Sequence, residues 1–312
     1  MAVSITVLMT VYNGGSYLPQ AIESVLQQRH KEFEFLIIDD ASTDDSLTLI
    51  HSYKDARIRV ISHQQNQGQV FSLNEGLKEA KGIYVARMDA DDSVSPHWLA
   101  LLLPIIQSEP RYAVLSAQAI AVNDNGLPLR FLWSPRSWSD ILLRILIASP
   151  INHVGCIMRR QVVLEAGGYA SHLMVAADYD LWSRLTRVGW LLGCYPKVLI
   201  KVRYHGKSLT ASQKGGLLIK EMTQVMGDNI KHFTSAVVST KQTTDLWYFI
   251  YAPQTLSSQE YARIGEDLKE IYRSFKNDQV PPRRKDSFLE RLLWVAAVKR
   301  FLGTSLLDWL RV

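Results

Sequence analysis

The chain has 312 residues, of which 47% are hydrophobic and 21% are charged. This length and composition allow a large core, so a mainly disordered protein is excluded and we expect one large domain with an extension. The formal net charge of +5 lies mostly in residues 211–312, which indicates either an anionic partner or a solvated basic helix face. The two cysteines exclude a disulfide scaffold and a cysteine zinc site, and they suit a reducing, cytoplasmic compartment.

The first part of the chain alternates short β-branched runs with amphipathic stretches. The pattern predicts strands over residues 5–11, 35–38, 59–62 and 83–88. Between them it predicts helices over residues 17–28, around 47–50 and over 73–80. Ser42, Thr43 and Asp44 are good N-caps for the second of these helices. Such alternation predicts an α/β fold, with a mostly parallel sheet covered by helices on both faces.

The later part of the chain is less regular. We expect strands over residues 113–122, 127–133 and 155–158, and helices over 178–188 and 217–275. Pro281 and Pro282 interrupt the helical region before a last basic, apolar segment. We therefore divide the chain into an α/β domain over residues 1–212 and a mainly helical extension over residues 213–312.

Three of the predicted strands end in polar or acidic residues, at 10–13, 39–40 and 89–92. In parallel sheets, ligands bind at the carboxyl ends of the strands. Carboxylates gathered there repel one another unless a cation shares the site, and their hard oxygens suit Mg²⁺ or Mn²⁺, which would in turn hold phosphates. The alternative is that these side chains only cap helices.

Competing motifs are missing from the sequence. There is no G-x-x-x-x-G-K-[ST] run and no G-x-G-x-x-G run after a strand, which disfavours a P-loop and a dinucleotide-binding fold. There is no G-x-S-x-G or H-E-x-x-H run, which weakens hydrolase and zinc-protease interpretations. The residues by themselves indicate a metal-assisted enzyme that acts on a nucleotide or a phosphate ester.

Several short runs occur along the chain in a definite order: T-V-Y-N-G-G-S-Y-L (10–18), I-I-D-D-A-S-T-D-D-S (37–46), N-Q-G (66–68), A-R-M-D-A-D-D (86–92), S-P-I-N-H-V (149–154), A-D-Y-D-L-W-S-R-L (177–185) and V-R-Y-H (202–205). Their order and spacing closely resemble those of family 2 glycosyltransferases with the GT-A fold. The resemblance covers roughly residues 3–210, and residues 211–312 match no family pattern that we can name. It implies a GT-A type, Rossmann-like, mostly parallel sheet, with nucleotide-sugar binding and catalysis in residues 1–212.

The resemblance also implies roles for single residues in donor binding. Thr10 and Tyr12 would line the nucleobase pocket, and Asp40 would hydrogen-bond the base. Asp89 would lie by the ribose and the diphosphate. His153 would approach the phosphates, and the alternative for it is a histidine satisfied between strands.

The metal site and the catalytic base follow from the same resemblance. Asp91 and Asp92 would hold Mg²⁺ or Mn²⁺, with Asp91 the stronger candidate, and His205 would lie near the metal. Asp178 matches the catalytic base at the start of a helix, where the usual Glu-Asp pair is Ala177-Asp178 in this chain. Asp180 is the rival for the base, but it points about 200° away around the helix, so both cannot face one substrate.

The function implied by the resemblance is that of a metal-dependent inverting glycosyltransferase. The donor would be a nucleotide-diphosphate sugar and the acceptor a glycan or a lipid-linked acceptor, in the assembly of a cell-surface polysaccharide, lipopolysaccharide or glycolipid. The substitution at Ala177 motivates the alternative of a catalytically silent nucleotide-sugar-binding or scaffold protein. A nucleic-acid-binding protein is disfavoured, because no basic module with interleaved aromatics is visible.

The C-terminal segment, residues 283–312, combines apolar residues at helical spacing with flanking Lys and Arg. This pattern suits a helix at a membrane surface, which would place the enzyme at the inner face of the cell membrane. The alternative is that the stripe packs on the catalytic domain or on a second subunit. The N-terminus does not resemble a signal peptide, and no apolar run reaches the roughly 18 residues that a membrane span requires.

Overall fold

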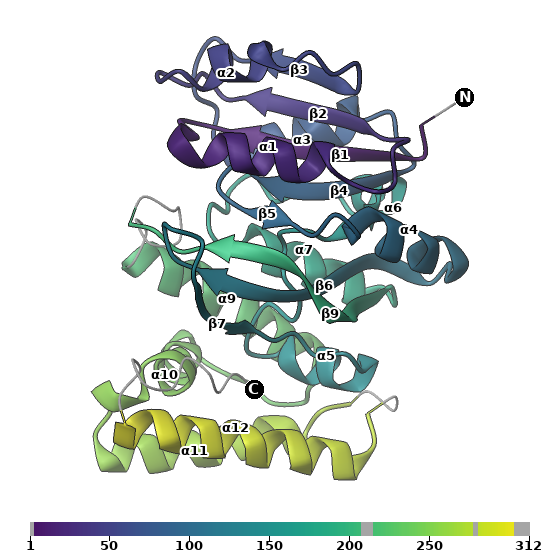
Figure 1. The fold of residues 1–312 in the computed structure, drawn as a ribbon. Coiled ribbons are helices and arrows are strands. Elements are labelled where there is room, and N and C mark those ends of the chain that lie inside the picture. The colour runs from purple at the N-terminus through teal and green to yellow at the C-terminus, as the bar shows by residue number, and fades with distance from the viewer. Residues whose placement is uncertain (1–2, 207–214, 277–279, 303–312) are drawn as a thin grey trace.

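The computed structural model describes residues 3–206, 215–276 and 280–302, with residues 301 and 302 described by their backbone only. Its centre is a nine-stranded sheet with the order β3-β2-β1-β4-β8-β6-β9-β5, and β7 pairs with β6 (Figure 1). The strands are β1 Ile5–Val11, β2 Glu34–Asp39, β3 Ile58–Ser62, β4 Tyr84–Asp89, β5 Ser93–Val94, β6 Tyr112–Val122, β7 Pro128–Leu132, β8 Ile157–Arg159 and β9 Leu191–Arg203.

The first four long strands run parallel to one another. β1 pairs in parallel with β2 and β4, and β2 pairs in parallel with β3. β8 is antiparallel to both β4 and β6, whereas β9 is parallel to β6. The sheet is therefore mixed, with a fully parallel N-terminal half, and the predicted α/β class is confirmed.

Helices cover both faces of the sheet, as the strand–helix alternation predicts. The helices are α1 Leu18–Leu26, α2 Ser46–Ser52, α3 Gln69–Glu79, α4 Trp98–Ser108, α5 Trp138–Arg144, α6 Arg160–Glu165, α7 Ala177–Arg187, α9 Gly216–Phe233, α10 Thr240–Tyr251, α11 Ser258–Arg273 and α12 Pro282–Leu302, with short 3₁₀ turns η1 Gly15–Tyr17 and η2 Pro253–Thr255. On one face α1 and α4 bury Ile22 and Leu102, and on the other α3, α6 and α7 bury Leu77, Val163 and Leu181.

The N-cap residue of the second helix is not one of the three predicted. α2 begins at Ser46 after Asp45, whose side chain makes no capping hydrogen bond, although Asp44 Oδ1 accepts the N–H of Ser46 at 3.0 Å. The Ser42 hydroxyl instead accepts the N–H of Asn13 at 3.0 Å, and the Asp44 carboxylate accepts the N–H of Gly15 at 3.1 Å. The polar residues after β2 therefore hold the loop after β1, because the parallel pairing of the two strands brings the two loops together.

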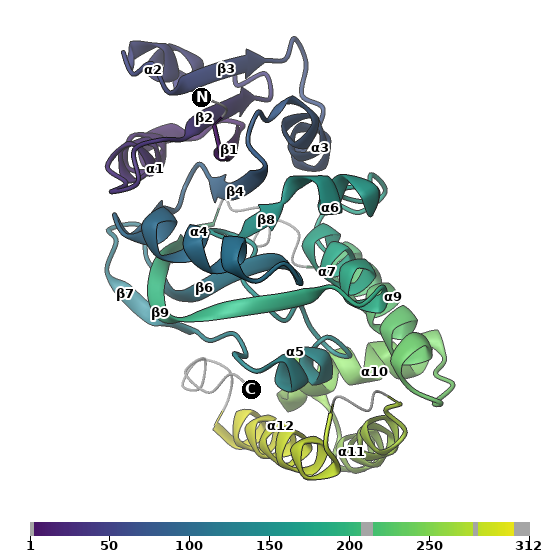
Figure 2. The same cartoon turned by 90° about the vertical axis from the view of Figure 1, so that its right-hand side faces the viewer.

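The helices after residue 215 share a hydrophobic core with the face of the sheet that α3, α6 and α7 cover (Figure 2). Val225, Phe249, Leu268 and Phe288, from α9, α10, α11 and α12, are all buried in this core. The extension is mainly helical, as expected. The proposed boundary between residues 212 and 213 lies outside the described residues.

The apolar stripe of the last helix is covered by the protein itself. Phe288, Leu292 and Val295 of α12 are buried, and α12 packs against α5, α11 and η2. Trp294 is different, since 56% of it is exposed. The stripe positions after residue 302 lie outside the described residues. In the described part of the chain, no helix combines the length and apolarity that a membrane span needs.

Candidate active site

The parallel strands place the expected nucleotide-binding residues at one edge of the sheet. Thr10 in β1 lies opposite Ile38 in β2 and opposite Asp89 in β4. Thr10 is buried, whereas 52% of Tyr12, just past the end of β1, is exposed. Tyr12 therefore presents its ring to solvent at the edge where the strand ends meet.

Two residues beside this edge have a left-handed backbone. The φ angles are 53° at Asn13 and 60° at Ala41, directly after Tyr12 and Asp40. A positive φ at alanine is strained by about 1–2 kcal/mol, and such strain clusters at functional sites. The Asn13 side-chain oxygen accepts the N–H of Thr43 at 2.8 Å, so the two loops hold each other in this conformation.

Asp40 is buried and already has protein partners. Its carboxylate accepts from the Nδ1 of His63 at 2.6 Å and from the backbone N–H groups of Gln67 and Gly68 at 2.9 and 2.8 Å. The Nε2 of His63 lies 2.6 Å from the Glu75 carboxylate. Burial disfavours the charged imidazole, but the hydrogen bonds to Asp40 and Glu75 outweigh it and raise the pKa of His63. Asp40 thus connects the end of β2 to the start of α3.

The end of β4 carries a buried ion pair. Arg87 is 3% exposed, and its guanidinium bonds both oxygens of Asp89. Gln69, from the start of α3, donates to the same carboxylate at 3.2 Å. Burial raises the pKa of Asp89 to about 6, Arg87 opposes that rise, and the neighbouring charge of Asp91 adds to it.

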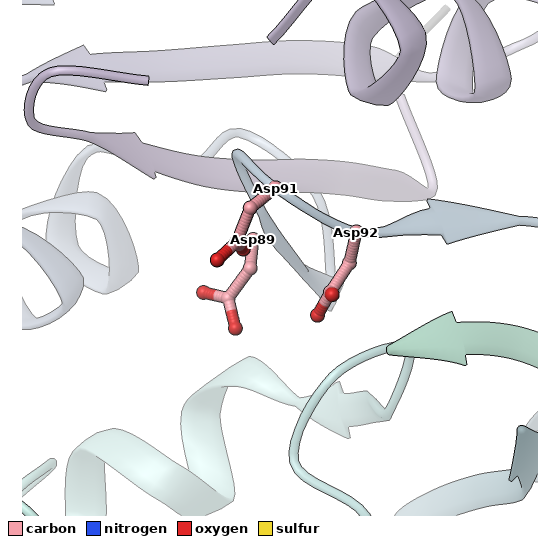
Figure 3. A group of neighbouring side chains, drawn as sticks. All are labelled: Asp89, Asp91 and Asp92. Atoms are coloured by element: carbon pink, nitrogen blue, oxygen red, sulfur yellow. The ribbon is translucent and has the colours of Figure 1, made fainter. Parts of the chain in front are cut away.

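Asp89, Asp91 and Asp92 form a carboxylate cluster in which one oxygen of each lies within 4.8 Å of the others (Figure 3). Burial, with the charges of Asp91 and Asp89, raises the pKa of Asp92 well above its ordinary value. His205 lies beside the cluster, with its Nε2 2.9 Å from Asp91 Oδ2. Crowded hard oxygens that resist ionisation together fit a divalent cation, which would offset their repulsion.

Arg203, at the end of β9, holds the loop that carries this cluster. Its backbone N–H donates to Asp92 Oδ1 at 2.7 Å. Its guanidinium lies over the aromatic ring of Tyr17, 4.7 Å from the ring centroid, in a cation–π contact. The guanidinium donates to the carbonyl oxygens of Asp91, Asn123 and Asp124 and to the side chain of Gln20. One arginine therefore joins the acidic loop, the β6–β7 turn and the start of α1.

Asp178 and Asp180 have different surroundings on α7. The Asp178 carboxylate accepts from the Ser149 hydroxyl at 3.1 Å and from the N–H of Tyr179 at 2.7 Å. Burial raises its pKa, although these hydrogen bonds oppose the rise. Asp180 instead pairs with Arg184 one turn later, at 2.8 Å. A raised pKa is the property that a general base working near neutral pH needs.

The last of the expected residues, His153, lies against two aromatic side chains. The Nε2 of His153 lies 2.7 Å from the hydroxyl of Tyr169, and its ring packs edge-on against Trp182. Burial, with the charge of Arg87, lowers the pKa of His153 well below its ordinary value, so the ring is neutral. This environment matches the alternative of a satisfied histidine more closely than that of a phosphate ligand.

The chain is similar to known glycosyltransferases. The model of the family described as "Glycosyl transferase family 2" matches residues 6–168. The chain is 31% identical over 226 residues to an uncharacterized glycosyltransferase of Haemophilus influenzae, across 66% of this chain and 67% of that protein. It is 29% identical over 224 residues to the amylovoran biosynthesis glycosyltransferase AmsE of Erwinia amylovora, across 70% and 83%.

The fold is also similar to solved structures. It matches S. aureus TarS 1–349 with a TM-score of 0.59 at 19% identity, across 98% of this chain and 90% of that one. It matches the mannosyltransferase PcManGT from Pyrobaculum calidifontis, in complex with GDP-Man and Mn²⁺, with a TM-score of 0.56 at 16% identity, across 96% and 87%. The protein has the GT-A type fold with a helical C-terminal part, and it belongs to glycosyltransferase family 2.

Three residues that shape the site were not singled out by the sequence. Arg87 and Arg203 lie within the runs A-R-M-D-A-D-D and V-R-Y-H, where the available signal was their position two residues before Asp89 and two residues before His205. Glu221 lies in α9, outside every recognised run, and its carboxylate reaches the residues just before α7. No pattern in the sequence connects it to the site.

Proposed function

We propose that the protein is a metal-dependent inverting glycosyltransferase that moves a sugar from a nucleotide-diphosphate sugar to an acceptor hydroxyl. The observation that carries the proposal is the pairing of a carboxylate cluster at the strand ends with a second, separate carboxylate of raised pKa, Asp178. The two are close enough for the charge of Asp178 to raise the pKa of Asp89. Sugar transfer from a diphosphate to a hydroxyl requires a base for the acceptor proton and a cation that stabilises the leaving diphosphate.

In the proposed reaction Asp178 takes the proton of the acceptor hydroxyl, and Ser149 orients its carboxylate. The acceptor oxygen bonds to the anomeric carbon from the side opposite the diphosphate, whose bond to that carbon breaks. Asp91 and Asp92 would hold the cation, with His205 beside Asp91. A bound Mg²⁺ or Mn²⁺ would supply positive charge to the leaving diphosphate.

We propose that the donor lies along the edge formed by Thr10, Tyr12 and Asp40, with Asp89 and Arg87 near its ribose and diphosphate. A carboxylate offers about four acceptor positions, and the protein uses three on Asp40, so one is left for a base N–H. TarS in complex with UDP-GlcNAc and PcManGT in complex with GDP-Man support a nucleotide-sugar donor. The likeness to AmsE supports a role in polysaccharide biosynthesis with a glycan or lipid-linked acceptor.

The location of the enzyme is part of the proposal. Cys156 and Cys194 are buried free thiols, which supports a reducing, cytoplasmic compartment. A peripheral membrane contact through residues 283–312 stays a prediction. The described part of that stripe is covered by the protein, so such a contact would rest on the outer face of α12, where Trp294 is exposed next to Arg291.

The test is an Asp178→Asn variant, with Asp180→Asn on the same helix as its matched control. We expect Asp178→Asn to lower kcat by about 10²- to 10⁴-fold, because it removes the base, and to leave donor binding unchanged. Asp180→Asn breaks the ion pair with Arg184 and should change only stability, by about 1 kcal/mol or less. The readouts are nucleoside-diphosphate release and thermal shift with UDP-GlcNAc and GDP-mannose in Mn²⁺.

Two outcomes would overturn parts of the proposal. An Asp178→Asn protein with wild-type turnover would remove Asp178 as the base. A wild-type protein that binds a nucleotide sugar with metal but turns over none would instead support the catalytically silent alternative. Ala177, which motivates that alternative, is buried in the core at the start of α7.

A further inference from the structure

Three consecutive backbone amides lead into the helix that carries Asp178, and one buried side chain accepts from all of them. The Glu221 carboxylate accepts the N–H groups of Met174 at 3.0 and 3.1 Å, Val175 at 2.8 Å and Ala176 at 3.0 Å. Ala176 is the N-cap of α7 and has no side chain that can cap it. Glu221 of α9 therefore satisfies the N–H of the N-cap residue from outside the helix, as the N3 glutamate of a capping box does within one.

Glu221 depends on these hydrogen bonds, because it is buried without an ion-pair partner among the described residues. Its side chain is 4% exposed, and within the described residues no lysine or arginine forms an ion pair with it. A buried carboxylate without a cation is stable only where hydrogen bonds replace its hydration, and the positive N-terminal end of a helix adds to that stabilisation. The position of the segment before α7 is thus fixed to the position of Glu221.

Asp178 is two residues after the last of these amides. Its carboxylate is held by weaker means, one hydroxyl of Ser149 at 3.1 Å and the N–H of Tyr179. Tyr179 is part of α7, and its hydroxyl anchors the helix by donating to the carbonyl of Ile145 at 2.6 Å. In the segment before α7, the side chain that binds the backbone amides is that of Glu221.

We propose that Glu221 is a positioning residue for the reaction: by holding the amides of residues 174–176, it keeps the carboxylate of Asp178 in the place from which it takes the acceptor proton. The inference rests on the proposed role of Asp178 as the base. It gives the C-terminal helices a part in the chemistry.

The chain offers a matched control on the same pair of helices. Asn229, two turns after Glu221 on α9, is fully buried, donates to the Ile145 carbonyl and the Ser183 hydroxyl, and accepts from Arg187. It joins α9 to the middle and end of α7 rather than to its start. Asn229→Ala therefore weakens the same interface without releasing the segment before Asp178.

The experiment compares Glu221→Gln and Asn229→Ala in the full chain, with UDP-GlcNAc and GDP-mannose in Mn²⁺. We expect Glu221→Gln to lower kcat by about tenfold to a hundredfold while the donor KM stays nearly unchanged, because a displacement of about 1 Å costs this much. Asn229→Ala should lower the Tm at least as much and keep kcat near the wild-type value. Loss of kcat in proportion to the loss of Tm in both variants would overturn the proposal.

A crystal structure of each variant decides the question even if neither donor is turned over. The Asp178–Ser149 hydrogen bond should be lost in Glu221→Gln and kept in Asn229→Ala, and a Glu221→Gln structure that keeps it overturns the proposal. Glu221→Asp, which keeps the charge on a shorter side chain, replaces Glu221→Gln if that variant does not fold. An active Asp178→Asn enzyme would refute the base itself, whereas an inactive one beside a fully active Glu221→Gln enzyme would refute only the positioning role.

Discussion

Two regions of the site differ in how their carboxylates are stabilised. One is the edge of the sheet formed by the ends of β1, β2 and β4. The other, called the wall below, is formed by the start of α7 and by Glu221 of α9. At the edge, Asp40 pairs with His63 and Asp89 pairs with Arg87, so charge is balanced by charge. At the wall, Asp178 and Glu221 are held by hydroxyl and amide donors. Changes at the edge should therefore act on charge and on binding, whereas changes at the wall should act on position and on kcat.

The largest effect at the edge is expected from Asp91. Asp91→Asn should lower kcat/KM by about a hundredfold or more, because a bound cation stabilises the leaving charge by several kcal/mol and about 1.4 kcal/mol is a factor of ten. The variant should also lose the response of donor binding to Mn²⁺ and to EDTA in thermal-shift measurements. Asp92→Asn should only reduce that response. Equal donor affinity of the wild-type protein with and without EDTA would contradict the metal site, and Arg87 would then be the cation in its place.

A smaller effect is expected from Arg203, whose guanidinium donates to the backbone oxygen of Asp91 in the acidic loop. Arg203→Lys cannot make the same set of bonds, so the affinity for Mn²⁺ should fall by about tenfold to a hundredfold, as for other residues that orient metal ligands. Arg160→Lys is the control, because Arg160 bonds the carbonyl of Gly82 at the opposite end of β4. A titration with Mn²⁺ should separate the two variants, and equal midpoints would show that Arg203 only stabilises the fold.

The smallest effect is expected from His63 and depends on pH. Because the folded protein raises the pKa of His63, the stabilisation is complete below its ordinary value of 6.5 and is lost as pH rises through the folded value. His63→Gln should therefore lower stability by about 1–3 kcal/mol at pH 6 and flatten its dependence on pH above that. Thermal unfolding from pH 6 to pH 9 measures this, with the exposed His51→Gln as control. An unchanged slope in His63→Gln would mean that the imidazole is neutral when folded.

The edge of the sheet could be predicted from the sequence, whereas other elements could not. The edge could be predicted because Thr10, Asp40 and Asp89 each follow a short β-branched run, and parallel pairing brings such ends together. Strand β9 and helix α4 could not be predicted from the periodicity of apolar residues. The pairing of β9 with β6 shifts register, which breaks the alternation of side chains, and α4 contains Pro104.

One prediction that failed and one that stayed open have the same cause. The residues after β2 were read as caps of their own helix, but Ser42 and Asp44 bond the loop after β1. The stripe on the last helix allowed both a membrane surface and a packed interface, and the buried Phe288 and Leu292 belong to the core of the protein. A polar or apolar residue has the same local preference whichever partner it meets, so only its neighbours in space decide between these outcomes.

The sequence by itself determined the α/β class, the helical extension, the family resemblance and the edge where acidic strand ends meet, because these depend on periodicity and on spacing within short segments. The tertiary structure decided the other half of the site. Asp92 meets the backbone of Arg203, Asp178 meets Ser149, and Glu221 meets the start of α7. These partners lie far apart along the chain, and a hydrogen bond depends on distance and direction in space, which no local pattern specifies.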